Sequence, residues 1–180
     1  NRTGDHNRFN GVSFTLKDLG YMIDFTPGRL SSYNPSTNVK TPLKLCWDLV
    51  DGLDGLTVIV HNDTAFLLQR QFYSDPSKFR YYDVSTDQWK TYGPSPSDFG
   101  YGGGFSLGGK IYYGLVRKTG DNYFTNVFKV YNKKLSRWET RASFPTIENT
   151  YVTASFAYND IGYILFANKK LYSYNPVSNS

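Results

Sequence analysis

The sequence is poor in the residues that build disulfides, metal sites and catalytic triads. Cys46 is the only cysteine among 180 residues, so an intrachain disulfide is excluded, and with it the class of small disulfide-stapled modules. Within the run Leu45-Cys46-Trp47, this thiol is better interpreted as a small buried hydrophobe than as a nucleophile. The sequence therefore offers no cysteine framework.

Histidine is nearly as scarce. His6 lies in a polar leader and His61 at a strand end beside a turn, and neither has a neighbouring set of metal ligands. No Ser-His-Asp arrangement follows from the pattern. We therefore expect no metal, no cofactor and no catalytic residue.

Long apolar runs and clustered charge are also missing. No stretch of 18 apolar residues occurs, so no transmembrane segment is expected. The chain has 20 Lys and Arg against 15 Asp and Glu, a net charge of +5, and its basic residues are scattered singly or in pairs. Nucleic-acid binders usually gather basic residues on one face, so we expect no nucleic-acid partner.

Aromatic residues and glycine are abundant instead. Aromatics make up 18% of the chain, and its 16 glycines fall between apolar runs rather than inside long periodic ones. Aromatic side chains favour strands, so the composition predicts an all-β domain of short strands and tight turns.

A hairpin pattern recurs four times along the chain. In each copy, an apolar strand is followed by a two-residue turn and a second apolar strand, and the turns fall at 17–18, 62–63, 108–109 and 159–160. Asn, Asp and Gly in these turns allow the left-handed backbone of a tight hairpin. Although Asn62 also begins a glycosylation sequon, we favour the turn interpretation there.

A second motif follows each hairpin. Tyr followed directly by Asn or Asp occurs at Tyr33, Tyr82, Tyr131 and Tyr174, with spacings of 49, 49 and 43 residues. Trp follows this Tyr by seven residues in the second and third copies, and Pro follows soon after each fourth strand. The period suits four-stranded propeller blades, which stack side by side because one sheet cannot bury both apolar faces alone.

The order of these motifs resembles the Kelch repeat, and the hairpins at 103–113 and 154–165 are similar to Kelch-like domains of bacterial surface lipoproteins. The resemblance implies a β-propeller with about four blades, at 9–50, 51–97, 98–147 and 148–180, after a polar leader at 1–8. The last blade is expected to be incomplete, because the position expected for its Trp falls beyond Ser180. We therefore expect either additional blades or self-association to close a larger ring.

Long loops between the second and third strands, with the connections between blades, are expected to share one face of the propeller. Tyr and Arg are common anchors of binding surfaces, and loops on rigid scaffolds often carry function. The candidate ligand-binding residues are Arg70, Tyr73, Tyr101, Arg117 and Tyr123. Some of these tyrosines could equally cap the core.

The sequence favours a non-catalytic binding or scaffold protein that recognises a protein or a glycan, located outside the cytoplasm at the cell surface. Two alternatives remain open. One is a carbohydrate-active enzyme, of mutarotase, epimerase or lyase type, with its site at the ring centre. The other is a cytosolic Kelch adaptor. Fold resemblance alone does not choose among them.

Overall fold

The computed structural model describes residues 11–24, 29–44, 56–68, 78–96, 101–117, 125–144, 148 and 150–179. All regular elements in these segments are strands, and the segments contain no helix long and apolar enough to cross a membrane. The strands are β1 (Gly11–Leu16), β2 (Leu19–Asp24), β3 (Arg29–Asn34), β4 (Val39–Pro42), β5 (Thr57–His61), β6 (Thr64–Leu68), β7 (Lys78–Asp83), β8 (Gln88–Pro94), β9 (Tyr101–Leu107), β10 (Lys110–Arg117), β11 (Val127–Asn132), β12 (Arg137–Ser143), β13 (Val152–Tyr158), β14 (Ile161–Phe166) and β15 (Leu171–Tyr174).

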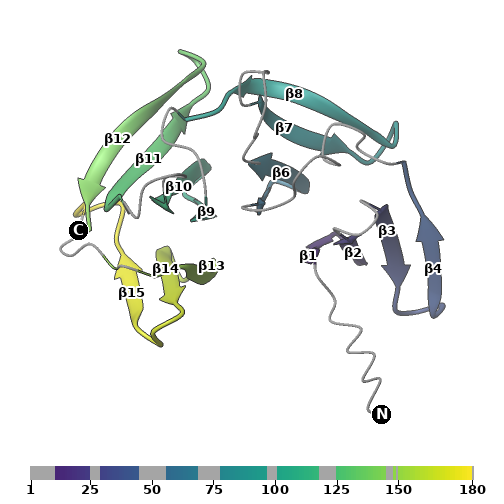
Figure 1. Ribbon diagram of the computed structural model, residues 1–180. Helices are drawn as coiled ribbons and strands as arrows, with labels where there is room; N and C mark the ends of the chain where they lie inside the picture. The colour runs from purple at the N-terminus through teal and green to yellow at the C-terminus, as the bar shows by residue number, and fades with distance from the viewer. Residues whose placement is uncertain are drawn as a thin grey trace, which may run out of the picture.

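The strands form four antiparallel sheets, each in simple sequence order. The first three sheets have four strands, and the fourth has the three described strands β13, β14 and β15. The sheets stand side by side as the blades of a propeller, with the first strand of each blade innermost, and together they form an arch with blades 1 and 4 at its two feet (Figure 1). The predicted all-β propeller with about four blades, the last of them incomplete, is confirmed.

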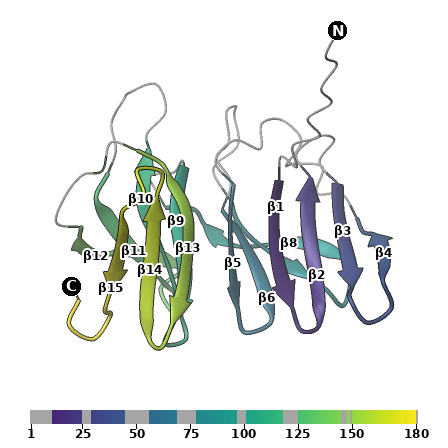
Figure 2. The same cartoon turned by 90° about the horizontal axis from the view of Figure 1, so that it is seen from below.

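Each blade begins with the tight hairpin that the sequence predicts. The register pairs the residues on either side of each turn, for example Leu107 with Lys110. Both turn residues have positive φ in three of the hairpins: Asn62 and Asp63, Gly108 and Gly109, and Asn159 and Asp160. Such a backbone matches the twist of the paired strands, which explains why Asn, Asp and Gly occupy these positions. These turns lie along one edge of the molecule, as the hairpins β1–β2, β5–β6 and β13–β14 show (Figure 2).

The Tyr-containing motif builds the turn between the third and fourth strands. Its Asn or Asp accepts a hydrogen bond from a later backbone N–H, in the pairs Asn34–Ser36, Asp83–Ser85, Asn132–Leu135 and Asn175–Val177. The Tyr hydroxyl donates to the residue five positions on, in the pairs Tyr33–Asn38 (2.9 Å), Tyr82–Asp87 (2.6 Å) and Tyr174–Asn179 (2.8 Å). These acceptors all have positive φ, near 50°. The repeated Tyr therefore fixes the turn as well as packing between blades.

Apolar side chains fill the spaces between neighbouring blades. Between blades 3 and 4, the Phe105 ring stacks on Tyr112 with centroids 5.6 Å apart and lies directly on Gly162. A Cβ atom at Gly162 would come under 3.0 Å from three carbons of this ring. Glycine at this position thus allows an aromatic ring of blade 3 to lie against the backbone of blade 4.

The glycine-rich run before the third hairpin forms the beginning of the innermost strand of blade 3. Gly102, Gly103 and Gly104 belong to β9, and the Gly104 backbone exchanges hydrogen bonds with the Ser155 hydroxyl of blade 4. The four sheets fall inside the four predicted blade ranges. The leader at 1–8 and Cys46 lie outside the described residues.

Candidate functional site

Three of the five candidate residues, Arg70, Tyr73 and Tyr123, lie outside the described residues. The backbones of Tyr101 and Arg117 are paired across β9 and β10, at the end of the hairpin remote from its two-residue turn. The topology therefore brings these two positions together at one end of blade 3. Their part in ligand binding stays a prediction.

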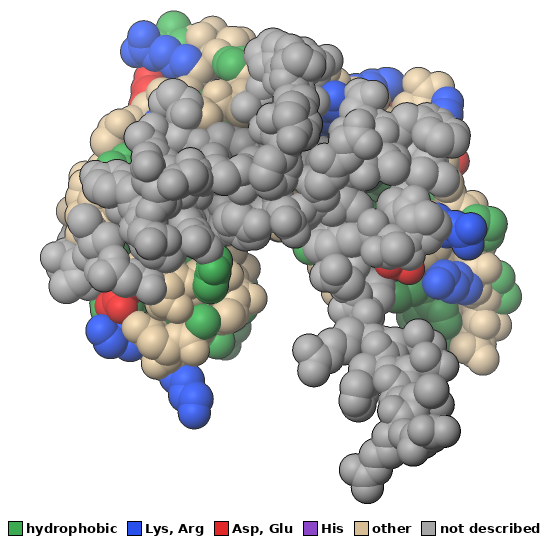
Figure 3. Space-filling model, viewed as in Figure 1, with side chains coloured by type: hydrophobic (Ala, Val, Ile, Leu, Met, Phe, Trp, Pro, Cys, Tyr) green, Lys and Arg blue, Asp and Glu red, His purple; other side chains and the backbone are tan. Residues whose placement is uncertain are grey.

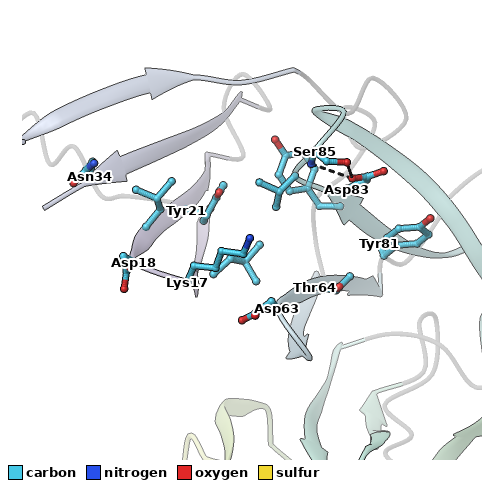
Figure 4. Close-up of a pocket in the computed structure, with 13 residues that line it drawn as sticks. Lys17, Asp18, Tyr21, Asn34, Asp63, Thr64, Tyr81, Asp83 and Ser85 are labelled. Carbon is cyan, nitrogen blue, oxygen red and sulfur yellow. Dashed lines mark hydrogen bonds between the residues drawn. The ribbon is translucent and has the colours of Figure 1, made fainter. Parts of the chain in front are cut away.

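The described residues form grooves on the opposite face, the one that carries the two-residue turns. The first interblade groove lies between blades 1 and 2 and encloses about 470 Å³ (Figure 4). It is lined by Leu16, Lys17, Asp18, Leu19, Tyr21, Asn34, Asp63, Thr64, Tyr81, Tyr82, Asp83, Val84 and Ser85. The hairpin turns of both blades thus form its rim.

One carboxylate of this first groove, that of Asp83, stabilises a turn of the fold. Asp83 accepts hydrogen bonds from the backbone and hydroxyl of Ser85, at 3.0 and 2.6 Å, and from the Lys90 ammonium at 2.5 Å. The bonds from Lys90 and Ser85 hold the pKa of Asp83 well below its ordinary value. Asp83 is thus a turn-forming group that remains charged, and its local partners already use its acceptor capacity.

The second interblade groove lies between blades 2 and 3 and encloses about 510 Å³, within the usual range for small-ligand sites. Its lining comes from two hairpin turns, from strands β5 to β8 of blade 2, from β10 and β11 of blade 3, and from the β11–β12 turn. The lining residues are His61, Asn62, Thr64, Phe66, Tyr81, Tyr92, Gly109, Lys110, Ile111, Tyr131 and Lys133.

Aromatic rings form a continuous wall in this second groove. The Tyr92 ring lies 4.9 Å from Phe66, 5.9 Å from Tyr81 and 5.4 Å from Tyr131, measured between centroids. Phe66 and Tyr131 are buried, whereas Tyr81 and Tyr92 are half-buried and present part of their surfaces to the groove. Such rings offer a rigid apolar surface with hydroxyl groups at its margin.

The charge of the second groove is entirely positive among its described lining residues. The Lys133 ammonium lies 5.7 Å from the centre of the Tyr92 ring, within the range of a cation–π interaction. Lys110 is exposed on the other rim. No Asp or Glu is found among the lining residues, so a bound anion would meet no carboxylate of the groove itself.

His61 links the two blades at the inner end of this groove. Its Nδ1 lies 2.6 Å from the Ser106 hydroxyl, and its Nε2 lies 3.2 Å from the Asn62 amide nitrogen. Burial, with a smaller contribution from Lys133, lowers the pKa of the imidazole, so the ring is neutral at pH 7. His61 ends β5 beside a two-residue turn, as the sequence predicts, and it is half-buried because Ser106 of blade 3 lies against its ring.

Sequence reasoning identified the turns on this face but not the groove. Tyr81 and Tyr92 lie on the two outer strands of blade 2, and these tyrosines could be noted in the sequence. The groove they line forms only where blade 3 packs beside blade 2, and the sequence pattern of one blade does not show this contact. In the part of the chain that the structure describes, no group of three His, Cys, Asp or Glu side chains is placed to hold a metal ion.

Searches with models of known protein families and among curated proteins find no match to this chain.

Proposed function

We propose that this protein is a non-catalytic binding propeller, and that its second interblade groove binds an acidic carbohydrate. The carrying observation is the combination of Tyr81 and Tyr92 rings with the Lys110 and Lys133 ammonium groups, in a groove of about 510 Å³ whose described lining has no carboxylate. The rings would pack against the apolar face of a sugar, and the ammonium groups would pair with its carboxylate.

A Kelch-type blade is part of this proposal. It is supported by the Trp that follows the repeated Tyr by seven residues, since the Tyr82 and Trp89 rings lie 5.0 Å apart, and those of Tyr131 and Trp138 lie 5.2 Å apart. A location outside the cytoplasm, where acidic glycans occur on cell surfaces and in matrices, agrees with the proposed ligand.

The test is a calorimetric titration with three probes: an oligogalacturonate, a neutral cello-oligosaccharide of the same length, and a polyglutamate peptide. Binding of the oligogalacturonate alone supports the proposal. Binding of the neutral sugar with equal affinity, or of the peptide alone, would contradict the assignment of an acidic sugar.

Variants locate the binding. Lys133→Glu is expected to weaken oligogalacturonate binding by about tenfold or more, because it replaces an attraction with a repulsion. Lys169→Glu is the matched control, since Lys169 is an exposed lysine in the turn between β14 and β15 of blade 4, away from the groove. The same loss of affinity in both variants would indicate non-specific attraction to a cationic protein.

A further inference from the structure

Each blade has a forward face, which meets the next blade along the chain, and a rear face, which meets the preceding blade. Two positions define the forward face here: the third residue from the end of the first strand and the third residue of the second strand. In blade 3 these are Phe105 and Tyr112, which are 2% and 4% exposed against blade 4. In blade 1 they are Phe14 and Tyr21, which blade 2 buries in the same way.

The forward face of blade 4 carries the same aromatic pair without a covering blade. Phe156 and Tyr163 occupy the two positions, and their rings stack with centroids 5.2 Å apart, as Phe14 and Tyr21 do at 5.2 Å. Yet Phe156 is 47% exposed, and Tyr158 at the end of the same strand is 65% exposed. The forward face of blade 4 is therefore left uncovered, and blade 4 stands at one side of the gap in the arch (Figure 1).

The rear face of blade 1 is uncovered in the complementary way. Its repeated Tyr33 is 36% exposed, whereas its counterpart Tyr174 in blade 4 is 3% exposed. Met22 is half-buried, whereas its counterpart Ile164 is fully buried. Hydrophobic side chains are visible on both feet of the arch in the space-filling view (Figure 3).

The two free faces also match in shape. At the blade 3–blade 4 contact, the Phe105 ring lies on Gly162, the second residue of its strand. Blade 1 has glycine at the same position, and a Cβ atom on Gly20 would find its nearest neighbour, the Tyr33 carbonyl oxygen, 3.9 Å away. The space beside Gly20 is therefore equivalent to the space beside Gly162 that the Phe105 ring fills. Phe156, the counterpart of Phe105 in blade 4, is the uncovered ring that would fill it.

From this match we propose that the forward face of blade 4 packs on the rear face of blade 1 in a second copy of this chain. The second copy makes the same contact in return, so two arches close into one ring with twofold symmetry. Two sets of four blades give a ring of about eight, the upper end of the usual propeller range. The occupant is a second copy because both halves of the interface, a protruding Phe and a vacant Gly, are found on one chain.

Light scattering coupled to gel filtration of the 180-residue protein tests this assembly. The expected mass is that of two chains, and a monomer at all accessible concentrations would overturn the proposal. Phe156→Asp on the forward face and Gly20→Leu on the rear face should each raise the dissociation constant by about 100-fold, because each disrupts both copies of the contact. Leu135→Asp is the control, since Leu135 is 55% exposed in the β11–β12 turn, away from both faces, and should leave the mass unchanged.

A mixing experiment separates this head-to-tail contact from other modes of association. The Phe156→Asp chain keeps an intact rear face, and the Gly20→Leu chain keeps an intact forward face. An equimolar mixture should therefore form a heterodimer through one intact contact, although each variant alone is a monomer. Failure of the mixture to associate, with both variants folded by circular dichroism, would refute the pairing of these two faces.

Discussion

Gly162 offers a sharp test of how the blades pack. Replacing it with alanine places a Cβ atom under 3.0 Å from three carbons of the Phe105 ring. That ring cannot move away easily, because it is stacked on Tyr112 and Phe128, with centroids at 5.6 and 5.4 Å. Either the ring or strand β14 must shift, and the packing between blades 3 and 4 is lost in part.

The magnitude follows from two opposing effects. Overpacking a tight core costs about 1–3 kcal/mol, and the rigid surroundings place Gly162→Ala toward the upper end of that range. Alanine also lowers the conformational entropy of the unfolded chain relative to glycine, which stabilises the folded protein by about 0.4–1 kcal/mol. The net loss is about 2 kcal/mol, which lowers the melting temperature of a domain of this size by about 4–8 °C.

Gly20→Ala is the matched control, because the same repeat position in blade 1 has open space around it. Both variants are made in a Phe156→Asp background, which removes the proposed association from the comparison. Their urea midpoints and thermal midpoints are then measured. Equal stability of Gly162→Ala and its parent, or equal destabilisation by both alanines, would refute the argument that blade 3 packs on blade 4 through this glycine.

Two further predictions concern carboxylates, Asp87 and Glu148, whose hydrogen bonds join separate segments of the chain. Asp87→Ala should lower the free energy of unfolding, measured in urea titrations, by about 2–3 kcal/mol. The Asp87 carboxylate accepts hydrogen bonds from the Tyr82 hydroxyl and the Lys44 backbone, and its positive φ is less favourable for alanine than for aspartate. An unchanged urea midpoint would contradict this structural role. Hydrogen bonds lower the pKa of Glu148 from 4.5 to about 2, and the bond from the Tyr172 hydroxyl makes the largest contribution. The charged Glu148 therefore stabilises the folded protein above pH 4.5, and this stabilisation is lost as the pH falls toward 2. Glu148→Gln should therefore flatten the pH dependence of the melting temperature in that window, and a profile parallel to that of the wild type would count against this linkage.

The hairpins and the Tyr-containing turns were predictable from the sequence because their causes are local. Asn62 and Asp63 form the two-residue turn between paired strands that are neighbours in the sequence. The hydrogen bond from the Tyr82 hydroxyl to Asp87 likewise joins residues only five positions apart. Local chemistry of this kind repeats with the blade and is therefore visible as a period in the sequence.

The second interblade groove was not predictable in the same way. His61 meets Ser106 across 45 residues, and the Tyr92 ring meets Tyr131 of the next blade. These contacts depend on the register and angle between two sheets, which the residue pattern of one blade does not specify. The free faces of blades 1 and 4 are likewise recognised only by comparing the burial of equivalent positions.

The proposed binding groove is tested most directly by following backbone amide signals in nuclear magnetic resonance spectra during titration with oligogalacturonate. The account predicts that the shifted signals cluster at residues 61–66, 81, 92, 109–111 and 131–133, around the second interblade groove. Signals that shift instead around Tyr101 and Arg117 would place the ligand on the opposite face and contradict the groove as the binding site.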